Sequence, residues 1–80
     1  MIVWGVATFS NIAADNDKTL TFYFSNTFNS SVVGSTITGG SSYAVYYVTT
    51  VSTNSAKIGC HNNKSNNTLT TTPTIMFFGY

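Results

Sequence analysis

The 80-residue sequence contains only two carboxylate side chains, Asp15 and Asp17. Enzymes that hydrolyse glycans normally place two carboxylates on either side of the scissile bond. These aspartates lie two residues apart in a polar segment, and no third acid is present to act with them. The run also lacks the glycine and the distal glutamate of a calcium-binding loop. We therefore expect a solvated turn here, with neither a catalytic pair nor a metal site.

Cys60 and His61 could in principle act as a nucleophile and a general base. Neighbouring residues of a strand point to opposite faces of the sheet, so these two side chains would diverge. One histidine with one such cysteine also falls short of the four ligands of a structural zinc site. Cys60 has no partner for an intramolecular disulfide. The sequence predicts a buried, inert Cys60, no metal or other cofactor, and no enzymatic activity.

Neutral polar side chains favour a different chemistry, the recognition of sugars. Ser, Thr and Asn account for 33 of the 80 residues. Their side chains can hydrogen-bond the hydroxyl groups of a sugar, while a tyrosine ring covers its apolar C–H face. Segments 11–18, 39–43 and 62–67 have this composition, although such segments can also be simple turns. The candidate ligand-binding residues are Tyr43, His61, Asn62, Asn63, Lys64 and Asn66.

Short β-strands must position these segments. Residues 19–24 alternate between apolar and polar side chains, which is typical of a half-buried strand, and residues 43–51 are dense in β-branched and aromatic types. Further strands are expected at 1–9, 32–38, 56–61 and 75–78, with loops at 10–18 and 62–72 and a turn at 39–42. About six strands without a helix predict an all-β fold, a single small antiparallel β-sandwich over residues 1–80. We expect Trp4 and Phe22 in its core.

The scarcity of charge excludes several classes of partner. The sequence has three lysines and no arginine, with a formal net charge of +1. Nucleic-acid binding requires a basic surface, which three scattered lysines do not supply. No segment approaches the roughly 20 apolar residues of a membrane-spanning helix. We expect neither nucleic acid as a partner nor membrane insertion.

Large apolar side chains occur on both faces of the predicted strands at 1–9, 43–51 and 75–80. In a single thin sandwich one face of each sheet meets water, so these strands would expose apolar side chains. Charges are also depleted at the centres of protein interfaces. The pattern favours association with further copies of the chain, although single exposed aromatic residues are also common.

The order of motifs resembles the C-terminal receptor-binding domain of bacteriophage tail fibres. The resemblance covers essentially the whole chain. It departs at Ser25 and Ser31, where that family usually has proline, and at Phe77-Phe78, where a Trp/Ile pair is more usual. The matching motifs are Ile2-Val3-Trp4-Gly5, Leu20-Thr21-Phe22-Tyr23-Phe24 followed by Phe28, Val32-Val33, Tyr43-Ala44-Val45 and the terminal Met76-Phe77-Phe78-Gly79-Tyr80.

The resemblance implies a homotrimer of small β-sandwiches, similar to the H-type lectins. It also implies a location in the virion, outside the cell, as the C-terminal part of a longer fibre protein. The expected partner is a host-surface glycan or an outer-membrane receptor, bound without catalysis. Two alternatives remain open: a structural trimerisation or capping module of a fibre, and a cellular H-type-like lectin or adhesin.

Overall fold

The structure is a computed structural model that describes all 80 residues, Met1–Tyr80. The predicted all-β class is confirmed, and no helix is present that could cross a membrane. The strands are β1 (Ile2–Val6), β2 (Phe9–Ile12), β3 (Asp17–Tyr23), β4 (Val32–Thr38), β5 (Ala44–Val51), β6 (Ser55–Asn62), β7 (Leu69–Thr71) and β8 (Thr74–Gly79).

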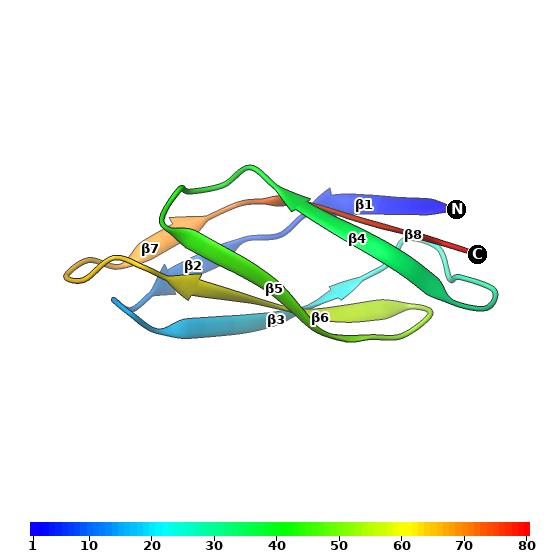
Figure 1. The fold of residues 1–80 in the computed structure, drawn as a ribbon, viewed down its shortest axis with the longest axis horizontal. Helices are drawn as coiled ribbons and strands as arrows, with labels where there is room; N and C mark the ends of the chain where they lie inside the picture. Colours follow the sequence, from blue (N-terminus) through cyan, green and yellow to red (C-terminus); the bar gives the residue numbers. More distant parts are fainter.

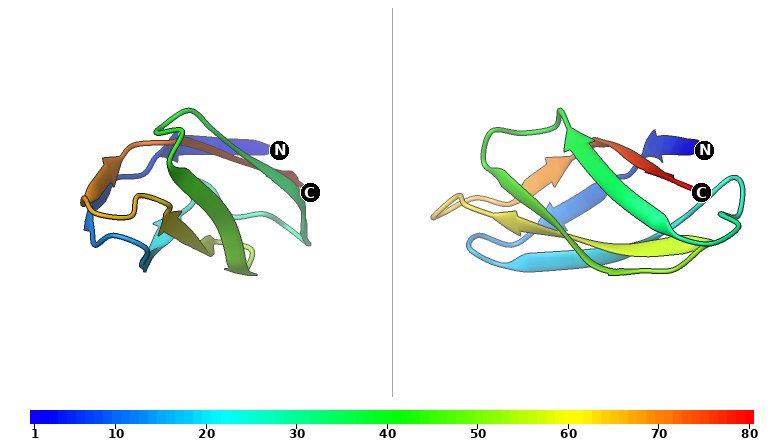
Figure 2. Two further views of the ribbon diagram at one scale, coloured as in Figure 1. Left: turned by 60° about the vertical axis from the view of Figure 1, so that its left-hand side comes forward. Right: turned by 45° about the vertical axis from the view of Figure 1, so that its right-hand side comes forward.

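The eight strands form three antiparallel sheets, with orders β1-β8-β4, β3-β6-β5 and β2-β7. Figures 1 and 2 show the two three-stranded sheets as facing layers, with β2 and β7 at one end. The molecule is elongated, with extents of 44 × 19 × 16 Å. The predicted antiparallel, sandwich-like architecture is therefore present in one chain.

The prediction of about six strands is wrong by two. A single strand over residues 1–9 does not form, because the chain leaves the first sheet after Val6 and the Ala7 N–H donates to the Pro73 carbonyl at 3.2 Å. The segments expected to be loops at 10–18 and 62–72 contain most of β2 and all of β7, which pair with each other. The other five predicted strands are confirmed, and β4 coincides with residues 32–38. The predicted turn at Gly39 and Gly40 is also confirmed, with both glycines at a φ of 77°.

The core fills the space between the two three-stranded sheets. Phe77 of β8 is fully buried, and its ring centroid lies 6.0 Å from that of Phe22 in β3 and 5.0 Å from that of Phe24. Cys60 is fully buried, as predicted. The core cluster consists of Val3, Ala7, Phe9, Ile12, Phe28, Ala56, Ile58, Cys60, Ile75 and Phe77.

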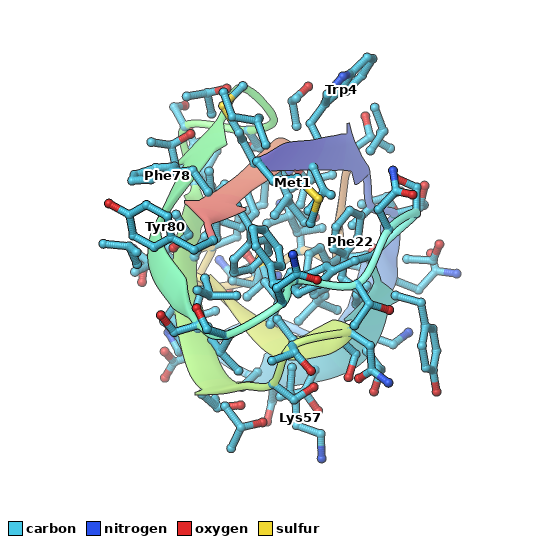
Figure 3. All side chains as sticks on the ribbon, turned by 90° about the vertical axis from the view of Figure 1, so that its right-hand side faces the viewer. Met1, Trp4, Phe22, Lys57, Phe78 and Tyr80 are labelled. Atoms are coloured by element: carbon cyan, nitrogen blue, oxygen red, sulfur yellow. The ribbon has the colours of Figure 1, made fainter.

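The side of sheet β1-β8-β4 that faces away from the core is apolar along β1 and most of β8, with Thr36, Thr38 and Thr74 in the same rows. In β1, Val3 points inward, so the alternation turns Trp4 outward with 65 % of its surface exposed. The expectation that Trp4 belongs to the core is therefore wrong, whereas Phe22 packs between the sheets; Figure 3 shows both. We call this side the apolar face; its members with large exposed surfaces are Ile2, Trp4, Val6 and Phe78, with Met1, Val33 and Tyr80 beside them.

Both termini lie at the same end of the long axis, and the turn between β6 and β7 lies at the other end (Figure 1). The N-terminal ammonium donates to the Gly79 carbonyl at 2.7 Å, and the Gly79 N–H donates to the Met1 carbonyl at 3.0 Å. The sheets thus hold the β6–β7 turn at the opposite end of the molecule from the chain termini.

Candidate ligand-binding site

A shallow polar depression of about 340 Å³ lies at the end of the molecule away from the termini. Its residues come from two places, the position just before β5 and the turn between β6 and β7. We call it the end pocket; its lining is Tyr43, Asn63, Lys64, Ser65, Asn66 and Asn67. It brings together four of the six residues singled out from the sequence, Tyr43, Asn63, Lys64 and Asn66. Ser65 and Asn67, which were not singled out, lie in the same asparagine-rich run.

Tyr43 and Lys64 form the aromatic and cationic part of the end pocket. The Lys64 Nζ lies 5.3 Å from the centroid of the Tyr43 ring, within the range of a cation–π interaction. The Asn63 N–H donates to the Tyr43 carbonyl at 2.9 Å, which ties the two halves of the pocket together. The ammonium group is thus held over the ring before any ligand arrives.

Asn62 lies beneath the end pocket and does not line it. This side chain is fully buried, and its amide nitrogen donates to the carbonyls of Ile12, Ala13 and Asn67 at 3.0, 3.3 and 2.9 Å. Its amide oxygen accepts from the Lys64 N–H at 2.8 Å. Because every polar atom of the side chain is used internally, Asn62 acts as a positioning residue for the turn that carries the pocket.

The segment between β2 and β3 supports the same turn from outside. The Asp15 N–H donates to the Lys64 carbonyl at 3.1 Å, and the Asn62 N–H donates to the Asn16 carbonyl at 2.9 Å. Asp15 has a φ of 55°, in the left-handed region that aspartate tolerates better than most residues. The end pocket therefore depends on two segments that are far apart in the sequence.

His61 points to the outer face of sheet β3-β6-β5, where it contacts both aspartates. The pairing of β3 with β6 places Asp17 directly opposite His61. Nδ1 of His61 lies 2.5 Å from Asp17 Oδ1, and Nε2 lies 3.2 Å from Asp15 Oδ1. The expectation of a solvated turn is confirmed for Asp15, whose side chain is 85 % exposed, and is wrong for Asp17, which begins β3; both carboxylates also contact His61.

Tyr47 completes this cluster from the third strand of the sheet. Its hydroxyl donates to Asp17 Oδ2, so the ring must cross the central strand β6. It crosses at Gly59, where an added Cβ would collide with the Tyr47 ring. Glycine at this position therefore allows Tyr47, Asp17 and His61 to form one hydrogen-bonded row.

The row shifts the ionisation of its members. The hydrogen bond from His61, followed by that from Tyr47, holds the pKa of Asp17 below its usual value. The same hydrogen bond to Asp17 raises the pKa of His61, and it also raises that of Tyr47. On the other face of β6, burial raises the pKa of the Cys60 thiol, which keeps that thiol protonated and unreactive.

These shifts give stability a defined pH dependence. The contribution of His61 is fully present below the unfolded pKa of about 6.5 and is lost as the pH rises through its higher folded value. That of Asp17 is present above about 3.9 and is lost as the pH falls through its lower folded value. We therefore expect the stabilisation that Asp17 and His61 give to the fold to be largest between about pH 4 and pH 6.5.

Thermal melts from pH 3 to pH 9 test this expectation, with His61→Gln as the comparison. Above pH 6.5 the melting temperature of the wild type should fall as His61 loses its proton, and this part of the fall should be absent in the variant. Lys57→Gln, on the same strand and face, serves as the control and should keep the wild-type profile. Identical profiles for wild type and His61→Gln would contradict the assigned role of His61.

The cluster is built as an ion pair, because both ring nitrogens of His61 face carboxylates. Neither nitrogen is directed at a nucleophile, and Cys60 lies on the opposite face of the strand. No group of three or more His, Cys or acidic side chains is arranged to hold a metal ion. The end pocket is thus the arrangement with the clearest capacity to bind a ligand.

A second depression lies among apolar side chains at the end with the termini. It has a volume of about 230 Å³ and continues the apolar face. Its lining is Met1, Ile2, Val33, Phe78, Gly79 and Tyr80. The end pocket is therefore polar and carries a lysine, whereas this second depression is apolar.

We compared the chain with known protein families, proteins and solved structures. No protein-family model, no curated protein and no solved structure matches the chain.

Proposed function

We propose that this chain is the receptor-binding tip of a phage tail fibre, which binds a polysaccharide of the host surface without catalysis. The observation that carries the proposal is the end pocket, in which a tyrosine ring and an asparagine-rich turn meet at one end of a rigid sandwich. The resemblance of the order of motifs to that of tail-fibre tips supports the same assignment. In this proposal the chain is the C-terminal part of a longer fibre protein and acts outside the cell, on the virion.

The chemistry of the end pocket suits a sugar. The amide groups of Asn63, Asn66 and Asn67 both donate and accept hydrogen bonds, as sugar hydroxyl groups require. Tyr43 supplies an apolar ring surface with a polar end. The pocket is open and shallow, which fits one or two sugar units of a chain that continues into solvent.

The position of the end pocket also supports a role as a tip. It lies at the far end of the 44 Å axis from Met1, where a preceding shaft would join the domain. A shaft attached there would hold the end pocket outward, toward the surface of the host cell.

The apolar face supports assembly into a homotrimer. Strands β1, β4 and β8 carry no charged side chain, and all charged side chains of the molecule lie on β3, β6 and the adjoining turns. An uncharged surface that exposes a tryptophan, a phenylalanine and aliphatic side chains is typical of a protein interface. Three copies joined through the apolar face would bury surface that an 80-residue chain leaves in water.

A homotrimer would also explain how a shallow pocket can give firm attachment to a host cell. Binding at one pocket makes the second event intramolecular, with a gain in avidity of roughly 10²–10⁴ where the geometry allows both. Weak single sites are therefore sufficient for firm attachment to a repeating polysaccharide.

We expect the double variant Asn63→Ala/Asn66→Ala to lose adsorption to host bacteria while keeping its fold and assembly. Each lost hydrogen bond contributes about 0.5–1.5 kcal/mol, so the loss of two should lower single-site affinity by about 5- to 150-fold. The measurement is adsorption of labelled protein to whole bacteria before and after periodate oxidation of their surface sugars. Asn26→Ala/Asn29→Ala, two exposed asparagines between β3 and β4, is the matched control and should adsorb like the wild type.

The outcomes separate the proposed function from its alternatives. Adsorption that periodate abolishes and the pocket variant loses supports a glycan-binding tip. Adsorption that survives periodate indicates a protein receptor. A trimer that adsorbs to none of a broad panel of bacteria favours a structural module, for which the apolar face is the supporting observation.

A further inference from the structure

We infer that the end pocket takes an anionic saccharide, whose carboxylate or phosphate group binds the ammonium of Lys64. This inference rests on the proposed function and adds the charge of the ligand to it. It follows from the way in which the few charges of the chain are paired.

Both acidic side chains are already engaged, and neither binds a lysine. Asp15 and Asp17 contact the two ring nitrogens of His61, and these are the two ion pairs of the molecule. Asp17 also accepts from the Tyr47 hydroxyl. The protein therefore provides no internal counter-ion for Lys64.

The three lysines differ in what surrounds them. Lys18 Nζ donates to the Ser10 carbonyl at 2.6 Å. Lys57 projects from β6 on the side away from the apolar face, as Figure 3 shows, beside a separate depression of about 200 Å³ that contains no aromatic ring or asparagine. Lys64 alone lines the end pocket, where its Nζ lies over the Tyr43 ring. The ammonium group of Lys64 is thus held by an aromatic ring, which leaves its hydrogen-bond donors available.

The rest of the lining is compatible with an anion. It contains no carboxylate, and the side-chain amides of Asn63, Asn66 and Asn67 can each donate two hydrogen bonds. A hydrogen bond to a charged group contributes about 1.5–3 kcal/mol, against about 0.5–1.5 for a neutral pair. A sugar that carries an anionic group therefore gains more from this lining than a neutral sugar of the same shape.

The carboxylate of Asp15, whose backbone adjoins the turn, does not cancel this preference. Asp15 is joined to Lys64 through its backbone N–H, but its side chain accepts from His61 Nε2. When His61 is protonated, the group formed by Asp15, Asp17 and His61 carries one net negative charge rather than two. The repulsion that an incoming anion meets from this side is reduced accordingly.

The experiment measures binding to one polysaccharide in three forms. The probe is the surface polysaccharide purified from a strain that adsorbs the protein, used native, carboxyl-reduced, or stripped of phosphate with aqueous hydrogen fluoride. The proteins are wild type, Lys64→Gln, Lys64→Arg and the control Lys57→Gln. Lys64→Gln should bind the native form about tenfold or more weakly, Lys64→Arg should recover most of the loss, and Lys57→Gln should equal the wild type.

The chemical treatments identify the anion and decide the inference. Removing the recognised group from the polysaccharide should weaken binding by the wild type as much as the substitution Lys64→Gln does. The same treatment should not weaken binding by the Lys64→Gln variant any further. Loss after carboxyl reduction indicates a uronate-type sugar, and loss after phosphate removal indicates a phosphorylated one. If wild type and Lys64→Gln bind all three forms equally while Asn63→Ala/Asn66→Ala does not bind, the inference is overturned and the glycan-binding function remains. If no form binds the wild type, both are overturned.

Discussion

Replacing Phe77 with alanine is expected to lower the free energy of unfolding by about 3–5 kcal/mol, the largest effect of any single substitution considered for this fold. Phe77 is fully buried in β8, the central strand of its sheet, and its ring contacts Phe22 and Phe24 from across the sandwich. Alanine would remove these contacts and leave a cavity between the two sheets. Denaturant unfolding followed by fluorescence or circular dichroism measures the loss.

Trp4→Ala is the informative comparison, because Trp4 is the larger side chain but lies on the apolar face. At protein concentrations low enough to keep the chain monomeric, its stability should remain close to that of the wild type. At higher concentrations Trp4→Ala should lack the stabilisation that self-association gives the wild type. Equal losses for Trp4→Ala and Phe77→Ala in the monomer would show that Trp4 stabilises the fold itself and would weaken the case for an interface there.

The strands that the sequence predicted correctly share strong local signals. Residues 32–38 and 43–51 are rich in β-branched or aromatic types and are bounded by small polar residues, and they form β4 and β5 with nearly the expected bounds. The missed strands, β2 and β7, are only four and three residues long, and polar residues make up half of β2 and two of the three residues of β7. Each of the two strands forms by pairing with the other, about 60 residues away in the sequence, so no local pattern indicates them.

Composition singled out four of the residues that line the end pocket, but neither their meeting nor the roles of their neighbours. Tyr43 reaches the asparagine-rich turn because Ala44 of β5 pairs with Asn62 of β6. That His61 binds Asp17, 44 residues earlier, depends on the register of β3 against β6. One signal could have separated Asn62 from the ligand-binding candidates: Ala56, Ile58, Cys60 and Asn62 alternate with outward residues, so the period-two pattern places Asn62 on the buried face.

Asn62→Ala is expected to destabilise the fold by about 2–4 kcal/mol, which is unusual for an asparagine next to a surface turn. Its amide group joins three backbone carbonyls and one N–H, which come from two segments about 50 residues apart in the sequence. Alanine would leave these groups without their partner, and a buried polar group left unpaired costs about 1–3 kcal/mol. Partial access of water to the loosened turn keeps the total below the sum of the separate costs.

The same substitution should also reduce polysaccharide binding, although Asn62 does not line the end pocket. Without its side chain, the Lys64 N–H loses its acceptor and the turn that carries the lining is no longer fixed to β2. Asn63→Ala is the matched control: it removes an exposed amide from the lining and should change stability by no more than about 0.5 kcal/mol. A stable Asn62→Ala that loses binding would instead indicate direct contact with the ligand, and equal stability of both variants would contradict the positioning role. Unfolding and binding measured on the same two variants therefore distinguish the residue that shapes the end pocket from the residue that touches its ligand.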